Sequence, residues 1–342
     1  MCLCSRKGEQ IVANGRNVYF FDPWSKMCMM NFDCSLSQLT SSMRIEPEPL
    51  SQHLENFIKE YVDKLERDGV VLGLSGGIDS AVVAALCARA VGAGNTLALI
   101  MPDRDSKKEH VKDALDFARS MGIETKLIDI TPHLSQLGTY ELFVLEGLPI
   151  GGESRETIIK RAYDLYRMVR GDTPFSASIV GFRDKEFGPY LGRANAYYRV
   201  KHRLRMVLLY LHAELENRLV VGAANKTEYR IGFFVKHGCD DAADIMPIIG
   251  LYKTQVRELA RFLGIPSRII DKAPSPDVIP GIVDEDAIGV PYEELDLILL
   301  ALEKGWGSDT IATVLNVERG KVEYVRSLVQ RSEHMRHLYT PR

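Results

Sequence analysis

The sequence predicts an α/β fold: a doubly wound parallel sheet with helices on both faces, and a helical C-terminal extension. The first observation is that short apolar, β-branched runs alternate with stretches of helical apolar spacing between residues 70 and 223. The second is a Ser-Gly-Gly-Ile-Asp-Ser loop directly after the first run, and the third is that residues 292–334 carry helical patterns only. Strands separated by helices pair in parallel because each connection must cross back over the sheet.

Size and charge exclude several classes of protein. At 342 residues, with 46% apolar and 26% charged residues, the chain is long enough for one large domain with appendages. The formal net charge of −3 gives no indication of nucleic-acid binding. No apolar run approaches the ~18 residues of a membrane span, and the first residues lack the apolar core of a signal peptide. We therefore expect a cytoplasmic protein with no nucleic-acid or membrane partner.

The first 45 residues carry little regular pattern. We expect residues 1–45 to form an irregular arm of unknown role, with a short hairpin around residues 12–21. Two interpretations of its cysteines stay open, because their spacing matches no common zinc finger: a zinc site, or reduced thiols. The four cysteines are Cys2, Cys4, Cys28 and Cys34.

The domain itself is expected over residues 46–337. Apolar residues at helical spacing predict a helix over 51–67, before the strand at 70–74 and the helix that follows the loop, in which Cys87 is a small core residue. The next predicted elements are a strand over 96–102, a helix over 108–121 and a strand over 124–130.

Residues 131–192 form an unusual insertion. Residues 137–150 fit a loop or a short helix, 154–170 an amphipathic basic helix, and 171–192 a surface loop rich in glycine, proline and aromatic residues. Because structureless loops beyond about 15 residues are usually functional or disordered, we expect the insertion to cover a pocket or lie at a subunit interface. Regular elements then return: a helix over 194–216, a strand over 217–223, a helix from the N-cap Asn225 to residue 235, and helices over 251–263, 292–303, 307–315 and 318–334.

The loop between the first strand and its helix carries the chemistry. Its two glycines let backbone N–H groups face a ligand, and the helix N-terminus favours an anion there. Asp79 repels phosphate but suits Mg²⁺, which can bridge a carboxylate and phosphates. The loop lacks the Gly-Lys-Ser/Thr of a Walker A motif and resembles the pyrophosphate loop of the ATP pyrophosphatase (PP-loop) superfamily, which cleaves ATP to AMP and pyrophosphate. The alternative is an ordinary Gly/Ser turn.

Several blocks in order extend the resemblance to the NAD synthetase family, of the ammonia-dependent type. They cover roughly residues 50–130 and 194–337, and are far more specific than the loop alone. The blocks after the loop are residues 200–206, 222–228, 232–238, 250–259, 272–277 and 284–296.

The resemblance implies an adenine nucleotide alpha hydrolase-like fold and a homodimer. It also implies that ATP adenylates the nicotinate carboxylate of deamido-NAD, and that ammonia then displaces AMP. By the same resemblance Asp79 and Lys253 would be catalytic, and Asp79 and Glu228 would hold Mg²⁺. Deamido-NAD would contact Arg203, Lys236, Asp244 and His334. ATP would contact Gly73, Leu74, Ser75, Gly76, Gly77, Ile78, Asp79, Ser80, Lys253 and Ser275.

The chain departs from the family pattern mainly on the acid-substrate side. Ala223 stands where the family usually has Thr, and Met335 where it has Lys, although Arg336 could supply the same charge. The loop over residues 238–244 is one residue longer than usual, which puts the role of Asp244 in doubt.

Alternatives to this function stay open. Residues 1–45 are too few for a glutaminase domain, so ammonia would come free or from a separate glutaminase. A related PP-loop amide ligase for a different carboxylic acid would fit the altered loop. A helix-turn-helix pattern over 311–325 would need a basic recognition helix, but Glu318, Glu323 and Arg326 are mixed in charge. A thiouridine-forming tRNA enzyme would need a cysteine pair beside the core strands.

Overall fold

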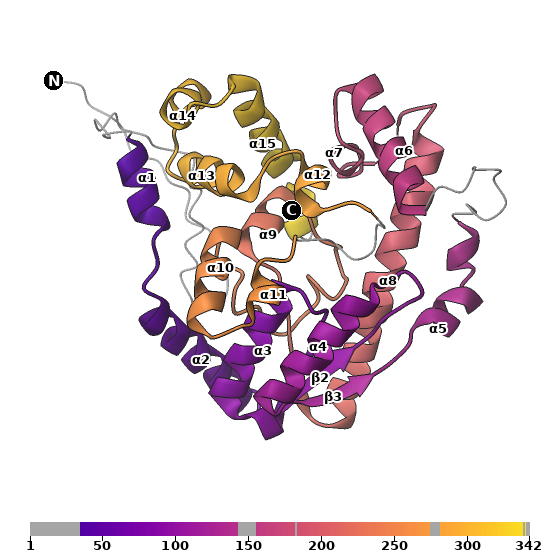
Figure 1. The fold of residues 1–342 in the computed structure, drawn as a ribbon, viewed down its shortest axis with the longest axis vertical. Helices are drawn as coiled ribbons and strands as arrows, with labels where there is room; N and C mark the ends of the chain where they lie inside the picture. The colour runs from indigo at the N-terminus through magenta and orange to yellow at the C-terminus, as the bar shows by residue number, and fades with distance from the viewer. Residues whose placement is uncertain (1–34, 143–154, 182, 274–280, 338, 340–342) are drawn as a thin grey trace, which may run out of the picture. The chain divides into compact units, whose positions relative to one another are not determined.

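A four-stranded parallel sheet lies in the lower half of the view in Figure 1. The computed structural model describes residues 35–142, 155–181, 183–273, 281–337 and 339. The strands are β1 (Gly69–Gly73), β2 (Thr96–Ile100), β3 (Glu124–Leu127) and β4 (Arg218–Val221), in the order β3-β2-β1-β4. Val71 on β1 lies opposite Leu97 on one side and Val220 on the other.

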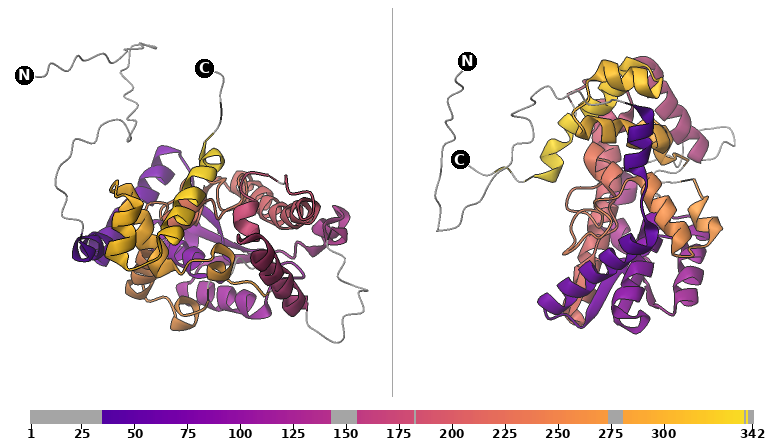
Figure 2. Two further views of the ribbon diagram at one scale, coloured as in Figure 1. Left: turned by 90° about the horizontal axis from the view of Figure 1, so that it is seen from above. Right: turned by 90° about the vertical axis from the view of Figure 1, so that its left-hand side faces the viewer.

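Helices cover both faces of this sheet, as predicted (Figure 2). Val70 and Leu72 point to a core shared with α2 (Pro47–Lys64), α3 (Ile78–Val91), α4 (Lys108–Met121), α10 (Lys253–Phe262) and α11 (Ser267–Ile270). Val71 points the opposite way, to a core shared with α8 (Gly188–Leu215). Both sets of alternate side chains are therefore buried, which explains why β1 is a continuous apolar run.

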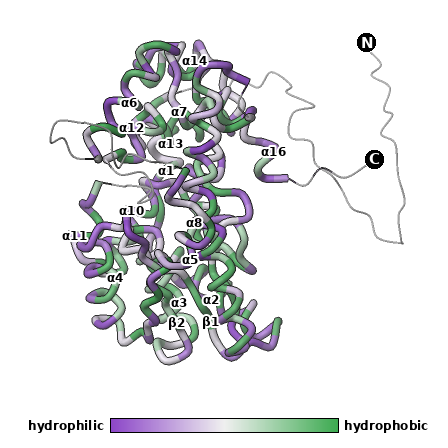
Figure 3. The backbone as a smooth tube through the Cα atoms, turned by 90° about the vertical axis from the view of Figure 1, so that its right-hand side faces the viewer, coloured by the Kyte–Doolittle hydropathy of each residue, from purple (hydrophilic) through white to green (hydrophobic). Residues whose placement is uncertain are grey.

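Helix α3 is the most deeply buried helix beside the sheet. Nine of its 14 residues are buried, and Figure 3 shows hydrophobic colour along it. Cys87 is fully buried there, and burial raises the pKa of its thiol. The prediction that Cys87 is a core residue is confirmed.

Some of the predicted helix boundaries agree with the structure and others differ from it. Helix α4 occupies residues 108–121 as predicted. Helix α9 (Lys226–Ile231) begins after the predicted N-cap Asn225, but it stops at Gly232, whose left-handed φ of 79° ends it before residue 235. Helix α8 begins at Gly188, six residues before the predicted start at 194.

The insertion is more helical than predicted. The basic helix appears as α6 (Arg155–Arg170), preceded by α5 (Thr131–Gln136) and the 3₁₀ turn η2 (Thr139–Glu141). The prediction of a loop over 171–192 is wrong in part, because α7 (Pro174–Ala177) and the first turn of α8 lie within it. The Thr173 hydroxyl caps α7 by accepting a hydrogen bond from the Ser176 N–H at 3.0 Å.

The end of the N-terminal arm is also helical. The expectation of an irregular arm is wrong for α1 (Leu36–Met43), which Ser35 caps and whose Leu39 is fully buried against α13 (Tyr292–Glu303). Pro47 occupies the first position of α2, where a proline is tolerated. The expected hairpin and the four N-terminal cysteines lie outside the described residues.

The C-terminal helices follow the prediction closely. The three predicted helices appear as α13, α14 (Ser308–Leu315) and α15 (Arg319–Arg331). Helix α12 (Asp284–Ile288) was not predicted, and α16 (Glu333–Arg336) is separate from α15 instead of continuing it. The helix-turn-helix spacing is core packing, because Ile311, Val322 and Val325 are fully buried. Within the described residues, none of the helices is long and apolar enough to cross a membrane.

Candidate active site

The Ser-Gly-Gly-Ile-Asp-Ser loop lies at the carboxyl end of β1. The chain runs from β1 outward to β2 and β3 and returns to the other side of β1 with β4, so the loop lies at the switch point of the sheet. Gly76 has φ = 79°, and a Cβ there would come within 2.2 Å of the His110 carbonyl oxygen. Only glycine fits this position.

Hydroxyl groups fix the shape of the loop. The Ser75 and Ser80 Oγ atoms are 3.0 Å apart, and the Gly77 N–H donates to Ser75 Oγ at 3.2 Å. Ser80 Oγ in turn donates to the Gly77 carbonyl oxygen at 3.0 Å. Lys272 Nζ donates to the Gly76 carbonyl oxygen at 3.2 Å, which adds a cation beside the N-terminus of α3. Lys272 is also paired with Asp113 at 2.5 Å. The loop thus has a fixed shape at the N-terminus of α3, a position that favours an anion.

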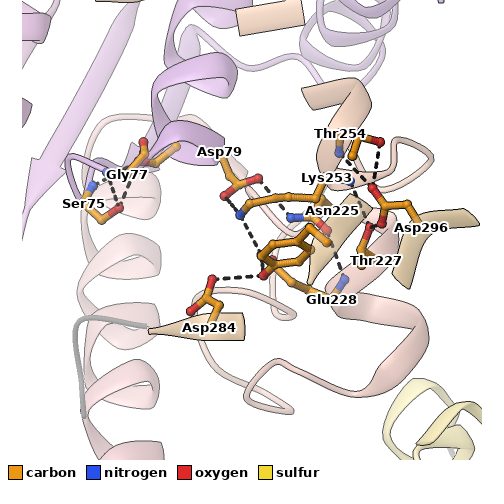
Figure 4. Close-up of polar contacts among 12 residues, drawn as sticks. Ser75, Gly77, Asp79, Asn225, Thr227, Glu228, Lys253, Thr254, Asp284 and Asp296 are labelled. Atoms are coloured by element: carbon orange, nitrogen blue, oxygen red, sulfur yellow. Dashed lines mark hydrogen bonds and ion pairs between the residues drawn. The ribbon is translucent and has the colours of Figure 1, made fainter. Parts of the chain in front are cut away.

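Lys253 brings the predicted carboxylates together (Figure 4). Its Nζ lies 2.6 Å from Asp79 Oδ2 and 2.9 Å from Glu228 Oε1, and its side chain is only 2% exposed. The Asn225 side-chain amide donates to the other Asp79 oxygen at 3.0 Å. Asp79, Glu228 and Lys253 therefore meet at one point, although they come from α3, α9 and α10.

A third carboxylate, Asp284, gives this cluster more negative than positive charge. Asp284 Oδ2 accepts a hydrogen bond from the Tyr292 hydroxyl at 3.0 Å, while its buried Oδ1 has no hydrogen-bond partner among the described residues. Burial and the neighbouring carboxylates raise the pKa of Glu228 to about 8 and that of Asp284 to about 6, although Lys253 opposes both shifts. Burial lowers the pKa of Lys253, but Asp79 and Glu228 outweigh burial and hold it above its ordinary value.

Asp296 holds these side chains in position. It accepts hydrogen bonds from Thr227 Oγ1 at 2.5 Å and from the Thr254 N–H and hydroxyl at 2.9 and 2.8 Å. The Lys253 N–H also donates to Thr227 Oγ1 at 2.9 Å. Asp296 thereby joins the first turns of α9 and α10, which carry Glu228 and Lys253. Sequence reasoning gave Asp296 no role; the signal is an aspartate on the apolar face of a helix.

One cavity of about 720 Å³ extends from the loop to the insertion. That volume is typical of a site for a small ligand. Helix α6 contributes Ile159, Tyr163 and Tyr166 to its wall, so part of the insertion faces the nucleotide loop across the cavity. The predicted ATP and metal residues that line it are Gly73, Leu74, Ser75, Gly77, Ile78, Asp79, Ser80, Glu228 and Lys253. Gly76 does not line the cavity, but its positive φ forms the turn of the loop. Ser275 lies outside the described residues.

The four residues predicted for the acid substrate are not among those that line this cavity. Arg203 donates to the Lys236 carbonyl oxygen at 3.3 Å, and Lys236 Nζ donates to the His334 carbonyl oxygen at 2.7 Å. These three residues are thus brought together, at a separate place. Asp244 instead accepts a hydrogen bond from the Val220 N–H of β4 at 2.8 Å.

The departures from the family pattern fall beside the cavity. Ala223 and Met335 both line it. Arg336, which could have replaced the missing lysine charge, donates to the Arg230 carbonyl oxygen at 2.8 Å and to the Val329 carbonyl oxygen at 2.9 Å. Its guanidinium therefore binds the ends of two helices.

Sequence reasoning missed a buried ion cluster after β2. Lys201 Nζ is fully buried, 2.5 Å from Asp103 Oδ2 and 2.6 Å from Asp105 Oδ2. The Tyr197 hydroxyl also donates to Asp105. The two aspartates directly after an apolar run were the available signal. The cluster ties α8 to the carboxyl end of β2, so its role is to hold one wall of the cavity.

A second missed group, His202, Cys239 and Asp240, lines the cavity. His202 Nδ1 lies 2.8 Å from Asp240 Oδ2 and 3.4 Å from Cys239 Sγ. Burial lowers the pKa of His202, but Asp240 and Cys239 outweigh it and raise the pKa to about 10. The pKa of Asp240 is lowered by His202 despite burial.

Comparison with known sequences identifies the family of this chain. The model of the NAD synthase family matches residues 50–142 and 182–339. An NH₃-dependent NAD⁺ synthetase of Thermotoga maritima is 43% identical over 291 residues, 84% of this chain and 96% of the relative. The enzyme of the same name from Archaeoglobus fulgidus is 38% identical over 292 residues, 85% of this chain and 93% of the relative. Residues 143–181, which include α6, lie outside the match to the family model.

Solved structures give the same result for the fold. A structure of NMN synthetase from Francisella tularensis superposes with a TM-score of 0.63 at 30% identity, covering 87% of this chain and 99% of that chain. An NH₃-dependent NAD synthetase from Campylobacter jejuni gives a TM-score of 0.58 at 26% identity, with the same coverage. The nucleotide loop, the parallel sheet and the sequence matches together establish that this chain belongs to the NAD synthase family.

Proposed function

We propose that the protein uses ATP and ammonia to amidate the nicotinate carboxylate of deamido-NAD, giving NAD, AMP and pyrophosphate, and that it does so in the cytoplasm. The observation that carries this proposal is the meeting of Lys253, Asp79 and Glu228 beside the pyrophosphate-type loop, in a cavity large enough for a second substrate. The names of its relatives support the ammonia-dependent reaction.

The site residues fit two successive steps. In the first, a carboxylate oxygen attacks the α-phosphorus of ATP, the bond to the bridging oxygen breaks, and pyrophosphate leaves. The loop and the N-terminus of α3 bind the departing phosphates, while the buried ammonium of Lys253 offsets their charge. In the second, ammonia attacks the acyl carbon, AMP leaves, and the nitrogen loses a proton. The α6 side chains that line the cavity limit the access of water to the acyl adenylate.

We propose Mg²⁺ as the metal, held by Asp79 and Glu228. The donor set fits, because Asp79 and Glu228 meet at one ammonium group and the nearby Asp284 has a buried Oδ1 with no hydrogen-bond partner among the described residues. Oxygen ligands of this kind suit a hard divalent cation. The ion would neutralise the triphosphate while the carboxylate approaches it.

A second acceptor has a specific observation in its favour. The NMN synthetase of Francisella tularensis aligns over 99% of its own chain. In addition, Arg203, Lys236, Asp244 and His334 do not line the cavity that holds the loop. A PP-loop amide ligase acting on nicotinate mononucleotide is therefore the alternative to the deamido-NAD enzyme.

Product analysis by mass spectrometry separates these proposals. The protein is incubated with ATP, Mg²⁺ and ammonium, and with either deamido-NAD or nicotinate mononucleotide. We expect NAD, AMP and pyrophosphate from the first acceptor at a much higher kcat/KM than NMN from the second. The reverse ratio would support the mononucleotide enzyme, and release of ADP would exclude both.

A parallel incubation tests the nitrogen donor. Glutamine replaces ammonium in otherwise identical reactions. We expect no amide product from glutamine alone and full activity once a separate glutaminase is added, because the proposed donor is ammonia. Equal rates with glutamine alone would contradict the proposal.

We also propose a homodimer. Helix α8 carries a row of exposed apolar side chains, with Val207 55%, Leu211 50% and Leu215 70% exposed. Their spacing of four residues places them along one face of the helix. A face of this kind favours burial against a second subunit.

A further inference from the structure

We propose that His202, Cys239 and Asp240 bind a thiophilic divalent cation, of which Zn²⁺ is the best match, on the wall of the cavity. Their ligand atoms all lie within 4.8 Å of one another. The site differs from the proposed Mg²⁺ site in its chemistry, because it combines one sulfur, one nitrogen and one oxygen donor. Donors of these three kinds favour zinc, whereas magnesium prefers oxygen alone.

The distances between the donor atoms fit a tetrahedral ion. With Zn–N bonds of ~2.0–2.1 Å and Zn–S bonds of ~2.3 Å, the edge between sulfur and a nitrogen or oxygen ligand is about 3.6 Å. Cys239 Sγ lies 3.4 Å from His202 Nδ1 and 3.7 Å from Asp240 Oδ1. His202 Nδ1 lies 2.8 Å from the other carboxylate oxygen, Asp240 Oδ2, and this contact is a hydrogen bond. Rotation of the Asp240 carboxylate, so that one oxygen faces both partners, would replace this hydrogen bond with the third edge.

The backbone holds the three residues in this arrangement. The Cys239 N–H donates to the His202 carbonyl oxygen at 3.2 Å. Gly238 packs so closely on α8 that a Cβ there would come within 2.9 Å of His202 Cβ. His237 takes a left-handed φ of 60°, and its N–H donates to Asp241 Oδ2 at 2.8 Å. The lengthened loop over residues 238–244 is thus fixed against the helix that carries His202, which reduces the ordering that an ion would have to impose.

The geometry disfavours a proton relay from the cysteine. In a relay the imidazole takes a proton at one ring nitrogen while a carboxylate holds the other nitrogen. Here both Cys239 Sγ and Asp240 Oδ2 face the same nitrogen, His202 Nδ1. Three donors around one point instead supply three of the four positions of a tetrahedral coordination shell. Since all three residues line the cavity, a fourth position on the ion is open to a water molecule or an anionic oxygen there.

Cobalt(II) is the probe for the test, because a thiolate–cobalt bond gives a charge-transfer absorption band that oxygen ligands do not. Cobalt is titrated into the full-length chain in excess Mg²⁺, which occupies carboxylate sites. Cys2, Cys4, Cys28 and Cys34 are replaced by serine throughout, so that the N-terminal residues contribute no thiolate. We expect the band to saturate at one cobalt per chain and to be displaced by zinc.

Three variants in this background locate the site. Cys239→Ser removes the band, and His202→Gln weakens cobalt binding by at least about tenfold, since each removes a ligand. Asp116→Asn, a surface carboxylate on α4 that makes no contact with this loop, is the control and leaves the titration unchanged. A band that persists in Cys239→Ser, or the absence of any band in the parent chain, overturns the proposal.

Thiol reactivity gives a measurement that needs no ligand substitution. In the serine background Cys87 is buried, so Cys239 is the accessible thiol among the described residues. We expect stoichiometric Zn²⁺, but not Mg²⁺, to slow alkylation of Cys239 by at least about tenfold, because a coordinated thiolate reacts poorly. Equal alkylation rates with and without zinc show that the three residues form an ion pair with a neighbouring thiol and no metal site.

Discussion

The charged groups of the site meet at one buried side chain, that of Lys253. Its ammonium group contacts two carboxylates, and its own helix is joined through Asp296 to the helix that carries Glu228. The free site is therefore pre-organised around a positive charge before any nucleotide arrives. One ammonium group does not neutralise all the carboxylates of the cluster. The pKa of Glu228 is therefore raised to about 8, and this carboxyl group stays partly protonated. A bound divalent cation would lower that pKa and release the proton.

At this scale we predict that Asp79→Asn abolishes adenylation while the protein stays folded. Asparagine keeps the shape and the contact with Asn225, but it removes the charge that faces Lys253. Losing such a group raises the barrier by about 3–4 kcal/mol, or roughly 10²–10³ in rate. Pyrophosphate–ATP exchange measures the rate, and circular dichroism checks folding.

Asp116→Asn is the control for this prediction, because Asp116 is a surface carboxylate on α4. It should retain full exchange activity. Near-normal turnover in the Asp79 variant would remove Asp79 from the site.

Some site residues could be predicted from the sequence and others could not. Ser75, Asp79 and Glu228 stand beside glycine or cap signals, which place them at the ends of elements before any tertiary contact is known. Asp296 and Asp284 carry no such local signal. Asp296 contacts Thr227 and Thr254, which lie 69 and 42 positions before it in the chain, and periodicity gives no information about contacts at such separations.

At the scale of elements, the insertion shows where pattern reasoning succeeds. Helix α6 was predictable because apolar residues recur along it at helical spacing, which leaves the charged residues on the opposite face. Its contacts were not predictable, since they depend on α12 and α8. The Tyr163 hydroxyl donates to the Ala287 carbonyl oxygen at 2.9 Å, and the Tyr166 ring packs edge-on against Phe187 at 5.1 Å. These contacts hold α6 over the cavity.

We predict that Tyr163→Phe loosens α6 and weakens acceptor binding. The change keeps the ring but removes one buried hydrogen bond, worth about 0.5–1.5 kcal/mol. We therefore expect KM for the acceptor to rise roughly two- to tenfold while KM for ATP changes little. Limited proteolysis should also cut residues 155–181 faster than in the parent chain. Tyr339→Phe, at an exposed position, serves as the control, and an increase confined to ATP would contradict the prediction.

Glu216 gives a prediction about pH at the junction of three elements. It accepts hydrogen bonds from Lys126 on β3 at 2.5 Å and from Arg218 on β4 at 2.9 Å, and these partners lower its pKa to about 2, against an ordinary value of 4.5. A carboxylate with a lowered pKa in the folded protein stabilises it above pH 4.5, and this contribution disappears as the pH falls towards 2.

We therefore predict that Glu216→Gln lowers the free energy of unfolding near neutral pH. The difference from the parent chain should shrink steadily as the pH falls through that window. Urea unfolding at several pH values measures it. Glu214→Gln, at an exposed glutamate in the last turn of α8, is the control and should show no such trend. A difference that stays constant with pH would show that Glu216 acts by packing alone.

At the scale of the whole molecule, the two-faced sheet could be predicted because its two inner strands β1 and β2 are almost continuous apolar runs, buried at nearly every position. A strand such as β1 can be buried on both faces only if helices cover both, so the doubly wound class followed from composition and order together. Subunit contacts cannot be recognised from the sequence pattern in the same way, because an exposed apolar face also occurs on monomers. The row on α8 therefore needs its own test.

We predict that Leu211→Glu converts the protein from a dimer to a monomer. Leu211 is the middle member of the α8 row, so a carboxylate there would be buried without a partner if two such faces packed together. The expected cost is several kcal/mol for each buried charge, enough to raise the dissociation constant by several orders of magnitude. Sedimentation equilibrium over a range of concentrations measures the mass. Leu65→Glu, at a position of similar exposure at the end of α2, should leave the dimer intact. If the parent chain is itself monomeric, or if both variants remain dimeric, the α8 row is not the subunit contact.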